Sequence, residues 1–206
     1  AVGTTIDSGG RQVLYTGSET VDTTVKNGGI MDVKGLSTVI RGNIDGGTMN
    51  VYGVMKPEST VTVHNGGVQH VYEKAAGTTV GAGGCQYVDW YYKFGIKAND
   101  GGLSVGTRVE SGGTQIVSSG CKAEDSIISG GQQDILSGGV ATGTRVEAGG
   151  SQVVASGGKS SNNQIVSDGH QHICSGGVAT GNIIRGGWQY VSAGGYAADN
   201  SLEADG

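Results

Sequence analysis

The sequence is poor in the residues that mark many other protein classes. Its 206 residues include one proline, one phenylalanine and three cysteines. An odd number of cysteines leaves at least one thiol unpaired. No CxxC motif or His/Cys ligand spacing supports a zinc site. No apolar run reaches the roughly 18 residues that a transmembrane helix needs, so we expect no membrane-spanning segment, and no stretch has the pattern of a signal peptide.

Charge is also scarce, and its sign excludes two classes of partner. Charged residues make up 15% of the chain, and the net charge is −5. Nucleic acids and anionic membrane surfaces both attract clusters of lysine and arginine. We therefore expect neither a nucleic acid nor a membrane surface as a partner.

Glycine is the residue that the chain has in excess, with 42 copies. The glycines fall in pairs and not at every third position, which excludes collagen, and a β-branched apolar residue returns in register with each pair, which excludes a disordered linker. A period near 19 or 20 residues indicates a solenoid. The pairs are Gly9-Gly10, Gly28-Gly29, Gly46-Gly47, Gly66-Gly67, Gly83-Gly84, Gly112-Gly113, Gly130-Gly131, Gly149-Gly150 and Gly186-Gly187, with Asp168-Gly169 in place of one pair.

One repeat, from Thr144 to Gly158, shows the expected path of a rung. A short strand ends at Val146, and the glycine pair then forms a tight turn, because glycine reaches positive φ without steric cost. A second strand runs from Ser151 to Val154, and a second glycine pair leads to a third short segment. Stacked in parallel, such rungs predict an all-β parallel β-helix of about ten 19-residue rungs.

Two columns of apolar residues recur in every rung and predict the core. Alternation along a strand sends them to the same inward side, and β-branched residues suit a buried pleated surface. The first column is Leu14, Val33, Val51, Val71, Val88, Val117, Ile135, Val154, Ile173 and Val191. The second is Ile6, Val25, Ile44, Val63, Val80, Val109, Ile127, Val146, Ile165 and Ile183.

A third column consists of glutamine, with methionine in two adjacent rungs. It shares the inward face with the first apolar column, so its amides are expected to be buried and to need partners. Stacking in register lets each amide bond to those above and below, as in glutamine ladders. The column is Gln12, Met31, Met49, Gln69, Gln86, Gln115, Gln133, Gln152, Gln171 and Gln189.

Both ends of the printed sequence lie inside the repeat. Residues 4–10 are already in register, and residues 202–206 have the pattern of an eleventh rung that stops at its turn. Solenoids need polar caps, and neither end has the pattern of one. We expect residues 1–206 to be a single β-helix segment from a longer repeat array, with any export signal or anchor outside it.

The largest departure from the repeat is an insertion at residues 89–100. Twelve residues separate Val88 from Gly101-Gly102, where a regular rung has two. Insertions in repeat proteins map to loops that often bind partners, and aromatic clusters favour recognition. Two interpretations stay open, namely a contact site and a hairpin that folds back over an edge. The candidate binding-loop residues are Trp90, Tyr91, Tyr92, Lys93 and Phe94.

No residue pattern points to catalysis. Carbohydrate-active β-helices use clustered acidic residues, whereas Asp and Glu are scattered here, and neither a GGxGxD calcium pattern nor a GxSxG elbow occurs. His170 and His172 lie on the same side of one strand, where an exposed face is favoured over a metal pair. We expect no enzyme activity, no catalytic residue, no metal and no cofactor, with a β-helical carbohydrate-active enzyme or a purely structural stalk as the alternatives.

The repeat, written xVxxGGxQxVxxGGxAxxT, resembles the passenger region of self-associating autotransporter adhesins of the AIDA, antigen 43 and TibA type. Residues 144–154 and 178–182 carry the likeness most clearly. The resemblance implies a right-handed β-helix on the surface of a Gram-negative bacterium, anchored to the outer membrane through a barrel outside this fragment. It implies self-association between cells, biofilm formation and adhesion to the host-cell surface.

The same resemblance implies covalent modification. Some members are heptosylated on many Ser and Thr residues of the repeats by a bacterial autotransporter heptosyltransferase, which would make this enzyme a partner. The candidate acceptors flank the turns and are Ser8, Ser111, Ser118, Ser129, Ser137, Ser156, Ser167, Ser175 and Ser192.

Overall fold

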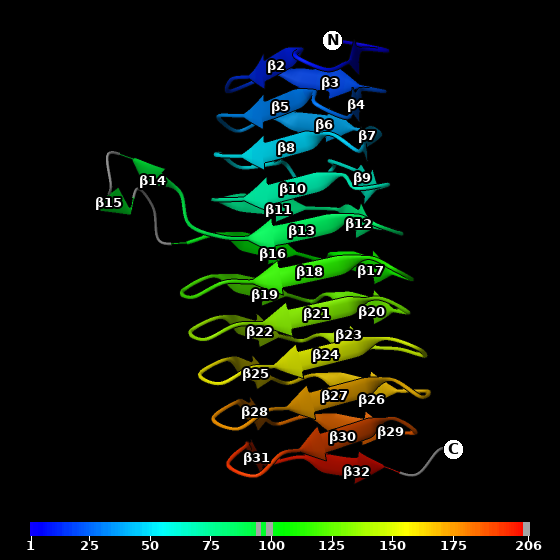
Figure 1. Ribbon diagram of the computed structural model, residues 1–206, viewed down its shortest axis with the longest axis vertical. Helices are drawn as coiled ribbons and strands as arrows, with labels where there is room; N and C mark the ends of the chain where they lie inside the picture. Colours follow the sequence, from blue (N-terminus) through cyan, green and yellow to red (C-terminus); the bar gives the residue numbers. More distant parts are fainter. Residues whose placement is uncertain (94–95, 98–100, 204–206) are drawn as a thin grey trace.

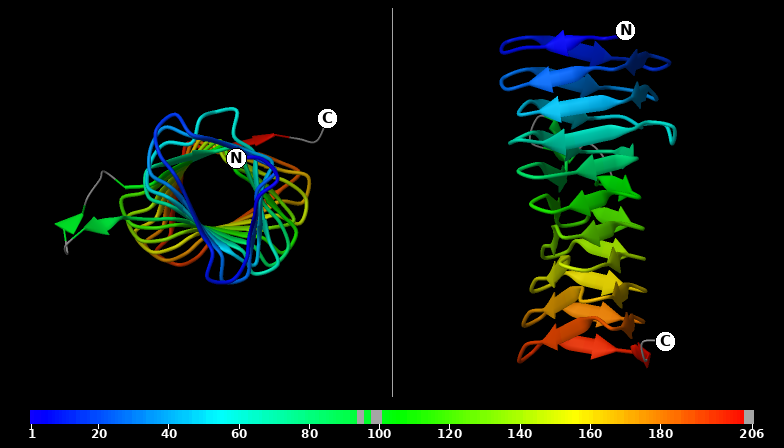
Figure 2. Two further views of the ribbon diagram at one scale, coloured as in Figure 1. Left: turned by 90° about the horizontal axis from the view of Figure 1, so that it is seen from above. Right: turned by 90° about the vertical axis from the view of Figure 1, so that its right-hand side faces the viewer.

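Each repeat of the sequence forms one turn of a parallel β-solenoid (Figure 1). The computed structural model describes residues 1–93, 96–97 and 101–203. As the chain descends in Figure 1, the near strands run from right to left and the chain returns behind them, which is a right-handed coil. The view along the axis in Figure 2 shows successive turns superimposed. The predicted all-β, right-handed parallel β-helix is thus confirmed.

Three parallel sheets run along the solenoid, and each regular rung contributes one strand to each. The first sheet has eleven strands: β1 (Thr5–Ile6), β4 (Thr24–Lys26), β7 (Gly42–Asp45), β9 (Val61–His64), β12 (Thr78–Val80), β17 (Arg108–Glu110), β20 (Ile127–Ser129), β23 (Arg145–Val146), β26 (Gln164–Val166), β29 (Ile183–Arg185) and β32 (Ser201–Glu203). The second has ten: β2 (Arg11–Leu14), β5 (Ile30–Val33), β8 (Thr48–Val51), β10 (Val68–Val71), β13 (Cys85–Val88), β18 (Thr114–Val117), β21 (Gln132–Ile135), β24 (Ser151–Val154), β27 (His170–Ile173) and β30 (Trp188–Val191).

The third sheet is shorter and begins lower in the solenoid. It has seven strands: β11 (Lys74–Ala76), β16 (Leu103–Val105), β19 (Lys122–Glu124), β22 (Val140–Thr142), β25 (Lys159–Ser161), β28 (Val178–Thr180) and β31 (Tyr196–Ala198). In the first two rungs β3 (Glu19–Val21) and β6 (Thr38–Ile40) pair separately. The remaining pair, β14 (Tyr92–Lys93) and β15 (Ile96–Lys97), is an antiparallel hairpin beside the rod (Figures 1 and 2). No helix in the described residues is long and apolar enough to cross a membrane.

The two residues of each glycine pair have different tasks. The first takes positive φ, as at Gly149 with φ 69°. The second has no room for a side chain, because a Cβ on Gly150 would lie 2.3 Å from the carbonyl oxygen of Ile128 in the preceding rung. Asp168 keeps the left-handed conformation with φ 62°, since a short polar side chain tolerates it. This explains why the one exception, Asp168-Gly169, replaces the first glycine and retains the second.

The first apolar column is buried as predicted from Leu14 to Ile173, because the strands of the second sheet pair in register. Val191 differs: its exposed fraction is 48%, because it lies in β30, the last strand of that sheet, and no further strand covers it in the described part of the chain.

The second apolar column needs two corrections. Ile128 and Ile184 pair with the core residues of the neighbouring rungs and are buried, whereas Ile127 and Ile183 are only half-buried. The prediction placed the core residue of these two rungs three positions before the glycine pair, as in most rungs. In these rungs the turn is one residue shorter, and an isolated bridge closes onto Gly130 or Gly186. The choice between two consecutive isoleucines was therefore wrong by one position.

The glutamine column forms the predicted ladder. From Gln86 to Gln189 each Nε2 donates to the Oε1 of the glutamine in the rung before it, over 2.6 or 2.7 Å, and Gln69 is the first acceptor. Hydroxyl groups supply second donors to the same oxygens, as Thr144 does to Gln133 at 3.3 Å. At the upper end Gln69 Nε2 meets the Sδ atom of Met49 at 3.5 Å, so the two methionines interrupt the ladder as expected.

The ladder divides the core in the C-terminal rungs. There the second apolar column, from Val80 to Ile184, is a separate hydrophobic cluster. In the N-terminal rungs Met31, Met49 and Met55 fill the middle, and the two columns merge into one cluster. The interior therefore changes from one apolar core to two apolar strips separated by a polar spine.

Candidate binding surface

A cluster of aromatic rings lies on the outside of the second sheet, near the hairpin. Tyr52 and Tyr72 directly follow β8 and β10, and their rings stack with centroids 5.1 Å apart. Tyr91, which precedes β14, packs its ring against both, at centroid distances of 4.7 Å and 5.7 Å. Because the rungs are in register, residues that are about 20 positions apart in sequence become direct neighbours here.

The stack continues along the sheet through a histidine. The ring of His70 lies between those of Tyr72 and Tyr87, with centroids 5.7 Å and 5.2 Å away and nearly parallel planes. Its Nδ1 is buried without a hydrogen bond among the described residues. Burial lowers the pKa of His70, against a smaller opposing effect of Asp89. The ring is therefore neutral at physiological pH and acts as an aromatic surface.

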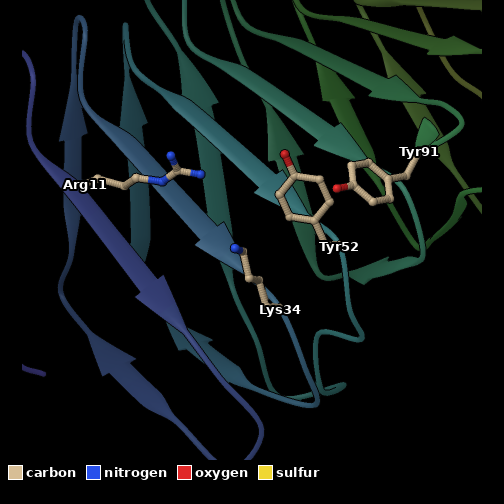
Figure 3. A pocket seen from close by; sticks show the side chains of 4 residues that line it. All are labelled: Arg11, Lys34, Tyr52 and Tyr91. Carbon is tan, nitrogen blue, oxygen red and sulfur yellow. The ribbon is translucent and has the colours of Figure 1, made fainter. Parts of the chain in front are cut away.

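Next to these rings is an open pocket of about 360 Å³, lined by Arg11, Lys34, Tyr52 and Tyr91 (Figure 3). The guanidinium of Arg11 and the hydroxyl of Tyr52 point toward each other across the opening, and the ammonium of Lys34 points into it. Burial, followed by the nearby carboxylate of Asp32, raises the pKa of Tyr52. The phenol thus stays protonated and can donate a hydrogen bond.

A buried carboxylate holds one of the two cations in place. Asp32 is fully buried and accepts hydrogen bonds from Arg11, through Nε at 2.8 Å and through a terminal nitrogen. The Nδ2 atom of Asn50 donates to the other oxygen of Asp32 at 2.9 Å. Since both carboxylate oxygens are occupied, Asp32 is satisfied and fixes the orientation of the arginine.

The base of the hairpin is attached to the rod by a tryptophan. Trp90 is partly buried against the main core cluster, and its Nε1 donates to the carbonyl oxygen of Ser119. A Cβ on Gly120 would lie 2.5 Å from the indole, so this turn admits the ring only because it has glycine there.

The predicted binding-loop residues therefore divide into three groups. Trp90 and Tyr91 pack on the solenoid, Tyr92 and Lys93 form β14 in the hairpin that stands beside the rod, and Phe94 lies outside the described residues. Sequence reasoning missed Arg11, Lys34, Tyr52 and Tyr72. A signal existed, because Lys34, Tyr52 and Tyr72 each follow a core residue of the first apolar column directly.

The nine candidate acceptor serines lie at the turns, but not all are equally accessible. Ser118 and Ser129 are half-buried. Sequence reasoning also missed Ser119, which is exposed and forms a column with Ser137 and its successors beside the glycines of the following rungs. The exposed candidates are Ser8, Ser111, Ser137, Ser156, Ser167, Ser175 and Ser192.

The remaining candidate chemistry is sparse in the described residues. No group of three or more His, Cys, Asp or Glu side chains there could hold a metal ion. His170 and His172 lie 6.3 Å apart between ring centroids and form a small aromatic patch with Tyr190. The three cysteines, Cys85, Cys121 and Cys174, lie in three different rungs.

Part of the repeat matches a known protein family. Residues 93–150 match the model of a family described as the adhesin of the bacterial autotransporter system, probable stalk. This segment is thus similar to the stalk repeat of autotransporter adhesins. The match begins in β14 of the hairpin and ends at the Gly149-Gly150 turn, within the regular rungs of the stalk repeat.

A solved structure shares the fold of the whole chain. It is the crystal structure of a hyper-glycosylated TibA fragment whose glycosylation TibC catalyses. The likeness covers 98% of this chain and 93% of that chain, with a TM-score of 0.50 and 24% sequence identity. A comparison with curated proteins gave no match. The comparisons therefore support the solenoid fold of the chain and a likeness of residues 93–150 to the stalk repeat.

Proposed function

We propose that this chain is part of a non-enzymatic adhesin passenger on the bacterial cell surface, where it associates side by side with copies on other cells. The observation that carries the proposal is the stalk-family repeat of residues 93–150 on a rod whose outward positions recur in every rung. A repeating surface lets weak contacts act together along the length of the rod. Aggregation of cells, biofilm formation and attachment to host cells follow from such contacts.

The test of this role is a settling assay. The full passenger that contains this chain is displayed on otherwise non-aggregating cells, and its surface exposure is verified by protease shaving. We expect cells with the passenger to settle and to bind cultured host cells. The matched control displays the same passenger without residues 1–206. Equal settling and equal adhesion of the two strains, at equal display, would show that this segment does not contribute.

We further propose that turn serines are heptosylated by an autotransporter heptosyltransferase. The exposed column of Ser137, Ser156 and Ser175 supports this, since it presents a hydroxyl at the same place in successive rungs. The crystal structure of the hyper-glycosylated TibA fragment shows that such a rod accepts sugars in that protein.

Intact mass spectrometry tests the modification. The chain is produced with and without a co-expressed heptosyltransferase, and we expect the mass to rise in heptose-sized steps only in its presence. The triple variant Ser137→Ala, Ser156→Ala, Ser175→Ala should carry fewer steps. A single unmodified mass in the presence of an enzyme that modifies a known substrate in the same cells would contradict the proposal.

A further inference from the structure

The pocket of Figure 3 is a positively charged place on a chain whose net charge is −5. Among the described residues that line it, Arg11 and Lys34 are cations, and they come from neighbouring rungs, Arg11 at the start of β2 and Lys34 directly after β5. Asp32 compensates one positive charge. None of the ion pairs within the described residues includes Lys34, so its charge is available to a ligand.

The arginine is arranged to bind a second anion. Its Nε and one terminal nitrogen both donate to Oδ2 of the buried Asp32. A guanidinium has five N–H groups, so donors remain for another acceptor. Because the carboxylate below is fully buried and also bonded to Asn50, the arginine does not need to be ordered by the ligand. This preorganisation lowers the entropy cost of binding.

The other two lining residues form aromatic walls. The rings of Tyr52 and Tyr91 meet edge to face, with centroids 4.7 Å apart and planes at 71°. Stacking against Tyr72 supports Tyr52 from behind. Each wall offers an apolar ring together with a hydroxyl group that can donate or accept a hydrogen bond. The site therefore combines apolar faces, polar edges and two cations within about 360 Å³.

We propose that this pocket binds a pyranose sugar that carries a carboxylate, such as a uronic or sialic acid unit of a surface glycan. A pyranose has C–H faces that pack on aromatic rings and hydroxyl edges that bond to the phenols, while its carboxylate matches Arg11 and Lys34. The volume lies at the small end of the range for ligand sites, which suits one sugar unit. An acidic peptide would use the two cations and leave the paired aromatic walls without a matching partner.

The inference rests on the proposed adhesive role, since it names a ligand for that surface, but its test uses the purified 206-residue protein. Binding is measured by ligand-observed NMR and calorimetry with a glucuronic acid disaccharide, a sialylated trisaccharide, a neutral glucose disaccharide and a glutamate-rich peptide. We expect at least one acidic sugar to bind with a Kd on the order of 1 mM. The neutral sugar and the peptide should bind at least about tenfold more weakly, and salt should weaken binding of the acidic sugar.

Two variants connect this binding to the pocket. Lys34→Gln should weaken acidic-sugar binding by roughly tenfold, as loss of a charge-assisted bond does. The matched control Lys122→Gln removes another exposed charge, in β19 of the third sheet, and should have no effect. Tyr52→Leu should abolish measurable binding, whereas Tyr196→Leu, at an exposed tyrosine in another rung, should not.

The outcomes separate this inference from the adhesin proposal. Equal binding of acidic and neutral sugars, stronger binding of the peptide, or equal effects of Lys34→Gln and Lys122→Gln would overturn the inference, while a positive settling assay would still support adhesion. Selective, pocket-dependent binding without settling would support the ligand and reject self-association. The acidic sugar that binds more tightly, the glucuronic acid disaccharide or the sialylated trisaccharide, identifies the source of the glycan.

Discussion

The N-terminal and C-terminal rungs share the first two sheets but have different interiors. Above Gln69 the space between the apolar columns is filled by Met31, Met49 and Met55, and the core is one cluster. From Gln69 onward the same space holds a hydrogen-bonded amide ladder, and the core is split in two. The glycine turns, and not the interior, therefore determine the path of the chain in each rung, because the same turn geometry occurs with both interiors.

The comparison also shows what the ladder adds. A methionine can slide past its neighbours with little loss, whereas each ladder amide has one partner at 2.6 or 2.7 Å in each adjacent rung. A slipped register would leave buried amides unbonded, at a cost of roughly 1–3 kcal/mol each. We therefore expect the strand register to be specified more strictly in the C-terminal rungs, and the N-terminal rungs to tolerate a shift in register better.

The largest effect should come from the second glycine of a pair, and it should be equal in both halves. In Gly29→Ala the new Cβ would lie 2.2 Å from the carbonyl oxygen of Ile6, and in Gly150→Ala 2.3 Å from that of Ile128. Each change should lower the free energy of unfolding by about 3 kcal/mol. Guanidinium unfolding measures this. A large loss in only one half would mean that the turns do not share one geometry.

The next effect should be specific to the ladder. Gln133→Ala removes a bond to Gln115 and a bond from Gln152 and leaves a cavity, so we expect a loss of about 2–3 kcal/mol. Gln133→Met keeps the volume and should cost about 1 kcal/mol less than the alanine change. Unfolding midpoints of both variants check this, with exposed Gln132→Ala as control. If all three variants matched the parent, the ladder would not stabilise the fold.

A pair of changes in the N-terminal half should convert its interior into that of the C-terminal half. The Oε1 of Gln12 is buried and has no hydrogen-bond partner among the described residues. Met31→Gln would place an amide whose Nε2 can donate to the Oε1 of Gln12, and Met49→Gln would continue the ladder to Gln69. The double variant should lose less stability than the sum of the two single losses, by about 1 kcal/mol in a double-mutant cycle. Strict additivity would show that the amides do not couple there.

The smallest effect concerns pH and the aromatic cluster, which spans the boundary between the two kinds of interior. Burial, followed by the neighbouring Tyr52, raises the pKa of Tyr72 to about 12, above its ordinary value of 10.0. The folded state thus holds this proton more tightly than the unfolded state. Its contribution is intact below pH 10 and is lost as pH rises toward 12.

Between pH 10 and pH 12 the free energy of unfolding should decline less in Tyr72→Phe than in the parent. The difference should be less than about 1 kcal/mol, because the phenol is only partly buried, and thermal unfolding measures it. Tyr196→Phe, at an exposed site, serves as control. A decline of the same size in Tyr72→Phe and the parent would show that this phenol does not contribute.

The repeat made most of the fold predictable from sequence, and its failures have identifiable causes. Glycine pairs and β-branched columns were sufficient for the strands, the turns and the ladder, because a solenoid copies one local pattern many times. Ile127 and Ile183 were misplaced because a turn shortened by one residue leaves no mark when two isoleucines are adjacent. Within the first apolar column, the exposure of Val191 depends on its place in the last strand and not on its own sequence context.

The candidate binding surface was only half predictable. The aromatic insertion stood out as a departure from the repeat, and it led to Trp90 and Tyr91. The cations and tyrosines that complete the pocket belong to ordinary rungs up to 80 positions away in the chain, from Arg11 to Tyr91. Their proximity follows from stacking and from the path of the chain before β14, which no single repeat encodes.

The central claim, that a buried glutamine ladder distinguishes the C-terminal rungs, is tested most directly by side-chain amide hydrogen exchange. In NMR spectra of protein labelled with nitrogen-15 at glutamine side chains, the Nε2 protons of Gln115, Gln133 and Gln152 should exchange far more slowly than those of Gln132 and Gln164, which are exposed in the same part of the solenoid. Protection of the first set alone is the predicted result. Equally fast exchange in both sets would contradict the ladder.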